Sequence, residues 1–289
     1  MRITQSMLSN NMLQNMSKSY SNMNTYMDQL STGKKISRPS DDPFIAVKSM
    51  GYKKQTAEIE QYKRNTNEMH VWMDNSDAAL NEATQTLQKV RELAVQASND
   101  ALDEEGRKSI QQEAVHLKES LIDIANTKVN GKYLFNGTNI DSKPVEGGNY
   151  KPESGPVNME VSDGVMLKAN VNGSEIFGEE LFKAVEGFID NLDSETNGET
   201  LEANIETIDE QLDKLVNERA DLGARMNRLE LVENRLSEQE LTTTKAMSEN
   251  EDIDYEEVIT NLLSQESVHR AALSAGSRII QPTLMDFLR

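Results

Sequence analysis

The chain has 289 residues, a formal net charge of -19 and no cysteine. Hydrophobic residues make up 36% and aromatic residues 5%, which favours thin helical bundles over one thick globular core. The acidic charge disfavours binding to nucleic-acid phosphates, and the lack of cysteine excludes disulfides, thiol nucleophiles and metal–thiolate sites.

A first helix is predicted over residues 3–32, because apolar side chains recur there at alternating intervals of three and four residues. The stripe consists of Leu13, Met16, Tyr20, Met23, Met27 and Leu30. Gly33 is a suitable stop for this helix, since glycine readily adopts the left-handed conformation that ends helices.

A second and longer helix is predicted over residues 43–99. Asp41 or Asp42 can cap its start, and Pro43 fits its first position. The same spacing runs through Met73, Ser76, Leu80, Ala83, Leu87, Val90, Ala94 and Ala97. A further helical segment carries Ile110, Ala114, Leu117, Leu121 and Ile124 and is expected to end near residue 131.

The sequence changes character over residues 131–178, which hold many of the Gly and Pro residues. Alternating apolar and polar residues over 157–161 and 165–171 predict two strands. Ser162-Asp163-Gly164 lies between them and is typical of a hairpin turn. We therefore expect a small β-rich domain here, followed by a short helix over residues 179–192.

A long helix returns over residues 200–248. Its apolar stripe consists of Leu201, Ile205, Ile208, Leu212, Leu215, Leu222, Met226, Leu229 and Leu236. Arg219 and Glu233 fall on the seam, where polar residues usually set the register at some cost in stability. The last helix is expected over residues 255–281, where Pro282 ends it.

These elements predict a mainly α fold, in which long helices from both chain ends form an antiparallel bundle or coiled coil, with a small β-rich inserted domain at the tip. Residues 1–42 and 249–289 would form a terminal coiled-coil assembly domain. Residues 43–130 and 179–248 would form a helical rod domain, and residues 131–178 the insert.

The terminal helices predict burial in an assembly. Lys18 and Asp28 are the only charged residues over 3–32, whereas a helix that faces water normally carries Lys and Glu. The predicted assembly residues are Leu13, Met16, Tyr20, Met23, Met27 and Leu30 in the first helix, and Leu262, Leu263, Ala272, Ala275 and Ile279 in the last. The alternative is a mobile tail, which would be compatible with folding on assembly.

The two chain ends carry opposite charge. Residues 1–40 hold five basic residues and one acid, whereas residues 249–289 hold eight acids and three basic residues. Antiparallel pairing would place Lys34, Lys35 and Arg38 beside Asp252, Asp254, Glu256 and Glu257. Exposed ion pairs contribute only about 0–1 kcal/mol each, so these charges would mainly select the register. We expect the two clusters to lie within about one Debye length, roughly 8–10 Å.

Motifs at both ends resemble the flagellin superfamily. Leu30-Ser31-Thr32-Gly33-Lys34 looks like the LSTGK segment of flagellins, and Arg38-Pro39-Ser40-Asp41-Asp42-Pro43 matches the RPSDDP segment of the hook-associated protein 3 family. Flagellins usually have Asp-Asp-Ala at the end of that second segment. Residues 87–96, 125–127, 131–137, 252–254 and 271–273 also resemble family segments, so the resemblance covers roughly residues 1–137 and 200–289.

The resemblance implies a structural subunit that joins hook-associated protein 1 to the flagellin filament and assembles with itself into a ring. It implies export by the flagellar type III apparatus, without a cleaved signal peptide, to the extracellular flagellum. A cytoplasmic chaperone would hold the C-terminal helix before export. Neither nucleic acid nor a membrane is an expected partner.

Enzymatic activity, cofactors and metals are not expected. The three histidines, His70, His116 and His269, are far apart in sequence and none has a second ligand four residues away. The sequence also lacks phosphate-binding glycine loops and the Gly-x-Ser-x-Gly and His-Glu-x-x-His motifs. Two alternative functions stay open, a short flagellin and a cytoplasmic coiled-coil scaffold, which would have stable ends in isolation and no export.

Overall fold

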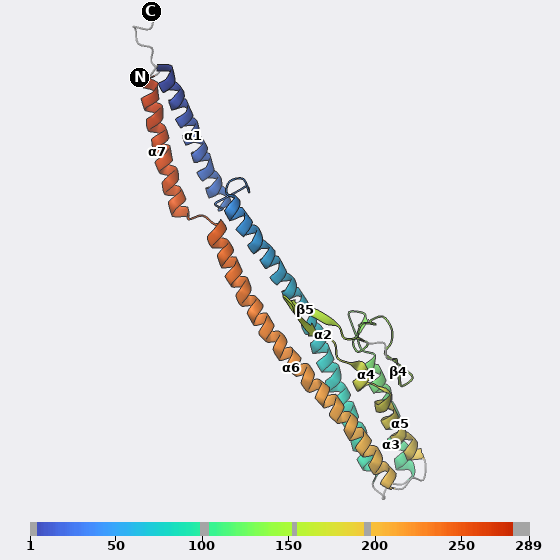
Figure 1. Ribbon diagram of the computed structural model, residues 1–289. Helices are drawn as coiled ribbons and strands as arrows, with labels where there is room; N and C mark the ends of the chain where they lie inside the picture. The colour runs from blue at the N-terminus through green and yellow to red at the C-terminus, as the bar shows by residue number, and fades with distance from the viewer. Residues whose placement is uncertain (1–4, 99–103, 152–154, 194–197, 280–289) are drawn as a thin grey trace, which may run out of the picture. The chain divides into compact units, whose positions relative to one another are not determined.

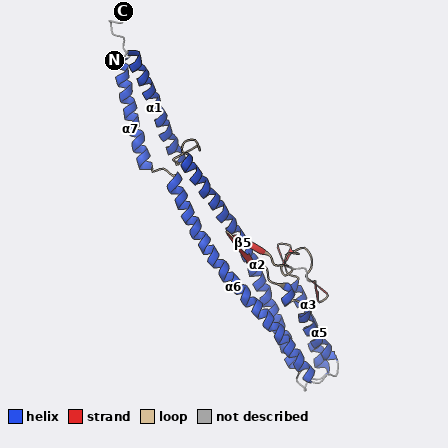
Figure 2. Cartoon of the chain, viewed as in Figure 1, coloured by secondary structure: helices blue, strands red, loops and turns tan. Residues whose placement is uncertain are grey.

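The computed structural model describes residues 5–98, 104–151, 155–193 and 198–279. It confirms the predicted mainly α fold with long helices at both chain ends. In the described residues, three small antiparallel sheets of two strands each lie in the middle of the chain, between α3 and α4, whereas the placement of this β-rich insert at the tip stays a prediction (Figures 1 and 2). The helices are α1 (Gln5–Thr32), α2 (Pro43–Ala97), α3 (Glu104–Ala125), α4 (Gly173–Ile176), α5 (Glu179–Asp193), α6 (Gly198–Glu251) and α7 (Tyr255–Ile279). The strands are β1 (Lys128–Val129), β2 (Lys132–Tyr133), β3 (Val145–Glu146), β4 (Asn149–Tyr150), β5 (Asn158–Ser162) and β6 (Val165–Lys168).

The long helices begin and end close to the predicted positions, but α3 ends earlier than expected. It stops at Ala125, because the tight hairpin of β1 and β2 follows at once. The hairpin turn places Asn130 at φ 52° and Gly131 at φ 82°, in the left-handed region that asparagine and glycine tolerate best. The sequence did not predict β1 to β4 or α4, which are too short to show a periodic pattern.

The chain divides into two compact units. The terminal unit consists of Met1–Glu58 and Gln239–Arg289, and the central unit is Ile59–Glu238. Helices α2 and α6 contribute to both units. The predicted three-domain boundaries at residues 42, 130, 178 and 248 stay a prediction. None of the helices in the described ranges combines the length and apolar character that a bilayer crossing requires.

The central unit contains the hydrophobic core. All eight members of the predicted α2 stripe, from Met73 to Ala97, are at most 1% exposed. Two predicted seam residues of α6 find polar partners on α2. Arg219 donates Nε and Nη2 to the Asp77 carboxylate at 2.6 and 3.2 Å, and Glu233 lies 3.0 Å from Nε2 of His70. A satisfied polar seam residue fixes which turns of two helices face each other, so these contacts support the predicted register role.

The β-rich region is fastened to this core by backbone and aromatic contacts. Asn65 of α2 donates its side-chain amide to the carbonyl of Glu160 in β5 at 2.7 Å. Phe135 and Phe177 are fully buried, and their rings meet edge to face at 4.9 Å. Gly173 begins α4 against Phe135, where an added Cβ would lie 2.1 Å from the Phe135 carbonyl oxygen, so only glycine fits.

The terminal unit has the opposite distribution of apolar side chains. Among its described residues, the only buried hydrophobic ones are Ala46, Ile253 and Val258. Thirteen of the nineteen large hydrophobic side chains that the described part of the chain exposes belong to this unit: Met7, Leu13, Tyr20, Met27, Phe44, Val47, Met50, Leu241, Tyr255, Ile259, Leu263, Val268 and Leu273. Because contiguous exposed apolar patches mark interaction sites, the candidate functional site lies here.

Candidate functional site

Helices α1 and α7 pair side by side and antiparallel through a thin seam (Figure 1). The half-buried or buried side chains that recur at intervals of three and four define this seam: Met12, Met16, Ser19, Met23, Tyr26 and Leu30 on α1, and Val258, Leu262, Gln265, His269, Ala272 and Gly276 on α7. Gln265 donates its side-chain amide to the Ser19 hydroxyl at 2.9 Å. A seam with hydroxyl, amide, imidazole and glycine members buries little apolar area, so it stabilises the pair weakly.

Helices α1 and α7 approach each other closely at Gly276. Met12 fills the space above this glycine, since an added Cβ would lie 1.8 Å from its terminal methyl group. The flexible thioether side chain of methionine suits such an irregular gap.

Half of the predicted α1 stripe lies in this seam and half does not. Met16, Met23 and Leu30 face α7, whereas Leu13, Tyr20 and Met27 are each 56% exposed. The predicted stripe is therefore divided between the seam and the exposed surface, and the assembly role of its six residues stays a prediction. The sequence reasoning missed the other seam residues of α1, Met12, Ser19 and Tyr26, which satisfy the same spacing. On α7, the predicted Leu262 and Ala272 lie in the seam, and Leu263 and Ala275 are exposed. The Ile279 side chain lies outside the described residues.

The exposed residues form a second surface, which we call the apolar face. On α1 each member follows a seam residue by one position: Leu13, Tyr20 and Met27 after Met12, Ser19 and Tyr26. On α7 the same holds for Ile259, Leu263 and Leu273, after Val258, Leu262 and Ala272.

One position along the chain corresponds to about 100° of rotation around the helix axis, and the rotation has the same sense on both helices when each is followed from its N-terminus to its C-terminus. Because the two helices run antiparallel, both sets therefore border the same side of the seam. The ring of Tyr20 lies 6.4 Å from that of His269, as this arrangement requires.

A compact bracket ties the start of α7 to the end of α1. Lys35 donates its backbone N–H to the Glu251 carbonyl at 2.6 Å, and Ile253 donates its N–H to the Gly33 carbonyl at 3.1 Å. Between these bonds, Nζ of Lys34 lies 2.7 Å from Oδ1 of Asp252 and 3.2 Å from Oε2 of Glu251. Paired backbone bonds fix the register more strictly than side-chain charges do.

Glu251 is the buried charge of the bracket. Its side chain is 5% exposed and its carboxylate is held between Lys34 and Nζ of Lys53, the latter at 3.0 Å. A buried carboxylate at the end of a helix opposes the helix dipole, so two ammonium groups offset an otherwise unfavourable position. Sequence reasoning did not select Glu251 or Lys53, because nothing in the pattern distinguishes them from other helix-surface charges.

The remaining predicted register charges have other roles in the described structure. Lys35 donates its ammonium to the Glu249 carbonyl at 2.7 Å, and Arg38 donates its backbone N–H to Asp41 at 2.8 Å. Asp254 caps α7 by accepting the N–H groups of Glu256 and Glu257 at 3.0 and 3.3 Å. Asp42, the second of the two predicted candidates, caps α2 by accepting the N–H groups of Phe44 and Ile45 at 2.9 and 3.1 Å.

The electrostatics of the bracket follow from these contacts. The hydrogen bond from Lys34 is the largest cause that lowers the pKa of Asp252, and the Ser248 hydroxyl adds to it. The same bond to Asp252 raises the pKa of Lys34. The backbone N–H of Arg38 is the largest cause that lowers the pKa of Asp41, in the turn before α2. All three groups therefore stay charged over the neutral range.

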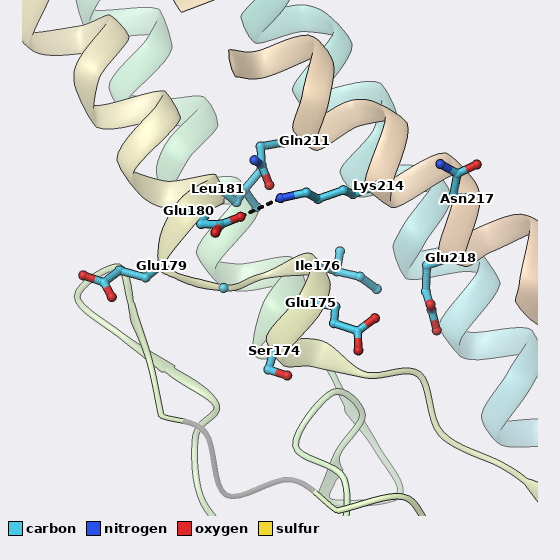
Figure 3. A pocket seen from close by; sticks show the side chains of 11 residues that line it. Ser174, Glu175, Ile176, Glu179, Glu180, Leu181, Gln211, Lys214, Asn217 and Glu218 are labelled. Carbon is cyan, nitrogen blue, oxygen red and sulfur yellow. Dashed lines mark hydrogen bonds and ion pairs between the residues drawn. The ribbon is translucent and has the colours of Figure 1, made fainter. Parts of the chain in front are cut away.

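The central unit contains a groove of about 740 Å³. It lies between α4, the start of α5 and α6, and four glutamates line it, as Figure 3 shows: Glu175, Glu179, Glu180 and Glu218. Glu180 pairs with Nζ of Lys214 at 2.5 Å, which lowers the pKa of this carboxyl. The Lys214 ammonium therefore favours the ionised form of Glu180.

Two family models match this chain. The family model of the bacterial flagellin N-terminal helical region matches residues 3–140, and that of the bacterial flagellin C-terminal helical region matches residues 205–288. The chain belongs to the flagellin family. The two matches together span most of the chain and include α1 and α7, so this flagellin-family chain is a structural component of the bacterial flagellum.

Similar proteins include two kinds of flagellar subunit. Flagellar hook-associated protein 3 of Escherichia coli is 26% identical over 95% of this chain and 96% of its own length. Flagellin of Bacillus subtilis is 28% identical over 92% of this chain and 94% of its own length. A putative flagellar hook-associated protein from Vibrio parahaemolyticus has a similar fold, with a TM-score of 0.67 and 21% identity over 73% of this chain and all of that one.

Proposed function

We propose that this chain is the subunit that joins the hook side of the flagellum to the flagellin filament. The observation that carries the proposal is the apolar face of the α1–α7 pair, in a unit whose described residues bury only three hydrophobic side chains. Such a pair is a marginal structure in water and gains stability when neighbours cover its exposed face. The exposed members of the predicted assembly set therefore act at contacts between subunits: Leu13, Tyr20, Met27, Leu263 and Ala275.

The junction position is favoured over a place along the filament by the segment before α2. Arg38-Pro39-Ser40-Asp41-Asp42-Pro43 is the version of this segment that resembles the hook-associated protein 3 family. The partners of the junction subunit on its two sides are hook-associated protein 1 and flagellin, and the subunit lies outside the cell. Export through the flagellar type III apparatus, with a chaperone on α7 beforehand, fits a pair that is weakly held by itself.

Deletion of the gene tests this function. Intact hooks together with flagellin secreted as monomers into the medium are the expected result, because filament growth needs the junction to seat the first flagellin. Bare hooks without secreted flagellin would contradict the junction role.

A substituted chain tests the apolar face directly. Leu13, Tyr20 and Met27 are replaced together by glutamine, which is a good helix former, so that α1 is retained. This variant should no longer be incorporated into flagella that are sheared from cells. The central unit of the purified variant should still fold. The matched control replaces the exposed Val71, Val95 and Val115 of the central unit by glutamine and should incorporate normally. Normal incorporation of the first variant would refute the role of the face.

A short flagellin is the second candidate, favoured by the 28% identity to Bacillus subtilis flagellin over nearly the whole chain. Gold labelling of the native chain separates the two candidates. Label confined to the base of each filament supports the junction subunit, and label along the whole filament supports the flagellin.

A further inference from the structure

The terminal unit exposes a second set of large apolar side chains at the start of α2, here called the α2 patch. Phe44, Val47 and Met50 are 68%, 70% and 67% exposed. They recur every three residues and so share one face of the helix. Gly51 has no heavy atom within 4 Å of the position that a Cβ would take, which leaves the same region of the helix open to a neighbour.

The rim of the α2 patch is basic. Nζ of Lys48 lies 4.5 Å above the ring of Phe44. Lys54 follows six residues later, where it pairs loosely with Glu58 at 3.5 Å. Lys48 has no carboxylate partner among the described residues. The patch therefore presents an apolar surface beside one ammonium group, that of Lys48, that no carboxylate of the described residues neutralises.

The start of α7 carries the complementary arrangement, here called the α7 patch. Tyr255, Ile259 and Leu263 are exposed, and Ile259 and Leu263 belong to the apolar face already described. Glu256 and Glu257 are exposed beside them, and neither forms an ion pair within the described part of the chain. Their backbone N–H groups are bound by Asp254, but their carboxylates are free to meet a basic neighbour.

The bracket fixes the positions of the two patches along the helix axes within the terminal unit. It joins Lys34 to Asp252, and from there α2 extends to one side and α7 to the other (Figure 1). One chain therefore cannot fold its own α7 patch onto its α2 patch. A neighbouring copy displaced along the axis would bring the two patches together.

We propose that the α2 patch of one copy packs against the α7 patch of a second copy. This inference rests on the proposed function, since it names the occupant of one part of the assembly surface. Apolar surface meets apolar surface, and Lys48 and Lys54 meet Glu256 and Glu257. The contact is heterologous, with different surfaces on the two partners.

Disulfide cross-linking tests the contact, because the natural chain has no cysteine that could interfere. Two full-length variants with different affinity tags, Val47→Cys and Ile259→Cys, are expressed together in cells that lack the native chain. Flagella are sheared off and oxidised mildly. We expect a dimer band that carries both tags, and loss of that band when Met166→Cys, exposed in the central unit, replaces either partner.

The outcomes separate this inference from the proposed function. If both variants reach the flagella but give no mixed dimer, or if Val47→Cys links only to itself or to another flagellar protein, the inference is wrong and the function stands. If the chain is absent from sheared flagella, both are wrong.

Charge reversal gives an independent readout. Lys48→Glu alone and Glu256→Lys alone should each reduce the mixed dimer. The two reversals should restore it when they are combined on the opposing surfaces, because they recreate the attraction. A combined variant no better than the single ones would overturn the charge pairing.

Discussion

Replacing Gly33 by alanine probes the bracket more directly than removing a charge. Gly33 has a φ of +70°, and its N–H closes α1 by donating to the Gln29 carbonyl at 2.8 Å. A residue with a Cβ atom costs about 1–2 kcal/mol in the left-handed region. The added Cβ would also lie 2.9 Å from Oη of Tyr255. That hydroxyl is the end of an exposed side chain and can move, so we expect the backbone strain of about 1–2 kcal/mol to dominate.

Amide hydrogen exchange measures this loss where it occurs. The N–H groups of Lys35 and Ile253 form the two backbone bonds of the bracket, so they exchange when it opens. A loss of about 1–2 kcal/mol corresponds to roughly 5–30-fold faster exchange of both amides. Amides of α2 between Met73 and Ala97, within the core of the central unit, should exchange at the native rate.

Gly51 supplies the matched control. It lies within α2, is exposed, and has open space around the position of a Cβ. Alanine at this position should strengthen the helix by about 1 kcal/mol. The reasoning is refuted if Gly33→Ala leaves exchange of the bracket amides unchanged, or if the two alanine substitutions shift stability in the same direction. Adding Tyr255→Phe to Gly33→Ala removes the contact with the hydroxyl and should recover only a minor part of the loss.

Three further predictions test the core, the seam and the electrostatics. Leu80→Ala should lower the free energy of unfolding by about 2–5 kcal/mol, because Leu80 is fully buried in α2. Leu231→Ala, at a position that is 71% exposed, should change it by less than about 0.5 kcal/mol. Urea unfolding, followed by the fluorescence of the single tryptophan, measures both. His269→Leu should stabilise the α1–α7 pair by about 1 kcal/mol, since Nδ1 of His269 is buried without a hydrogen-bond partner, and slower amide exchange in α1 would show it. The pKa of Asp252 is lowered from 3.8 and that of Lys34 is raised from 10.5, so their ion pair stabilises the bracket fully between about these two pH values. The stabilisation is lost as the pH falls through the folded pKa of Asp252 or rises through that of Lys34. Protection of the bracket amides that is the same at about pH 3 as at neutral pH would contradict this.

The central unit could be predicted well from the sequence because its long helices bury one continuous stripe each. From Met73 to Ala97 the apolar spacing has one interpretation, and the helix follows it. The end of α3 and the short strands could not be predicted in the same way. They depend on tight turns such as Asn130-Gly131 and on contacts with distant residues, which leave no period in the sequence.

The α1 seam shows why the terminal site was only half predictable. Two stripes fit the same three-four spacing and share Met16, Met23 and Leu30. Hydrophobicity alone selects Leu13 and its equivalents, but the helix turns those side chains outward and buries positions such as Ser19, which bonds to Gln265. The choice depends on what α7 offers across the seam, and a pattern within one helix does not contain that information.

The uneven burial also determines what a spectroscopist would observe. The single tryptophan, Trp72, is half-buried in the central unit, whereas the terminal unit holds α1 and α7. Emission at this indole reports the state of one unit, and far-ultraviolet ellipticity sums over both. The two melting curves of the isolated chain should therefore fail to superimpose, and neither midpoint describes the molecule as a whole.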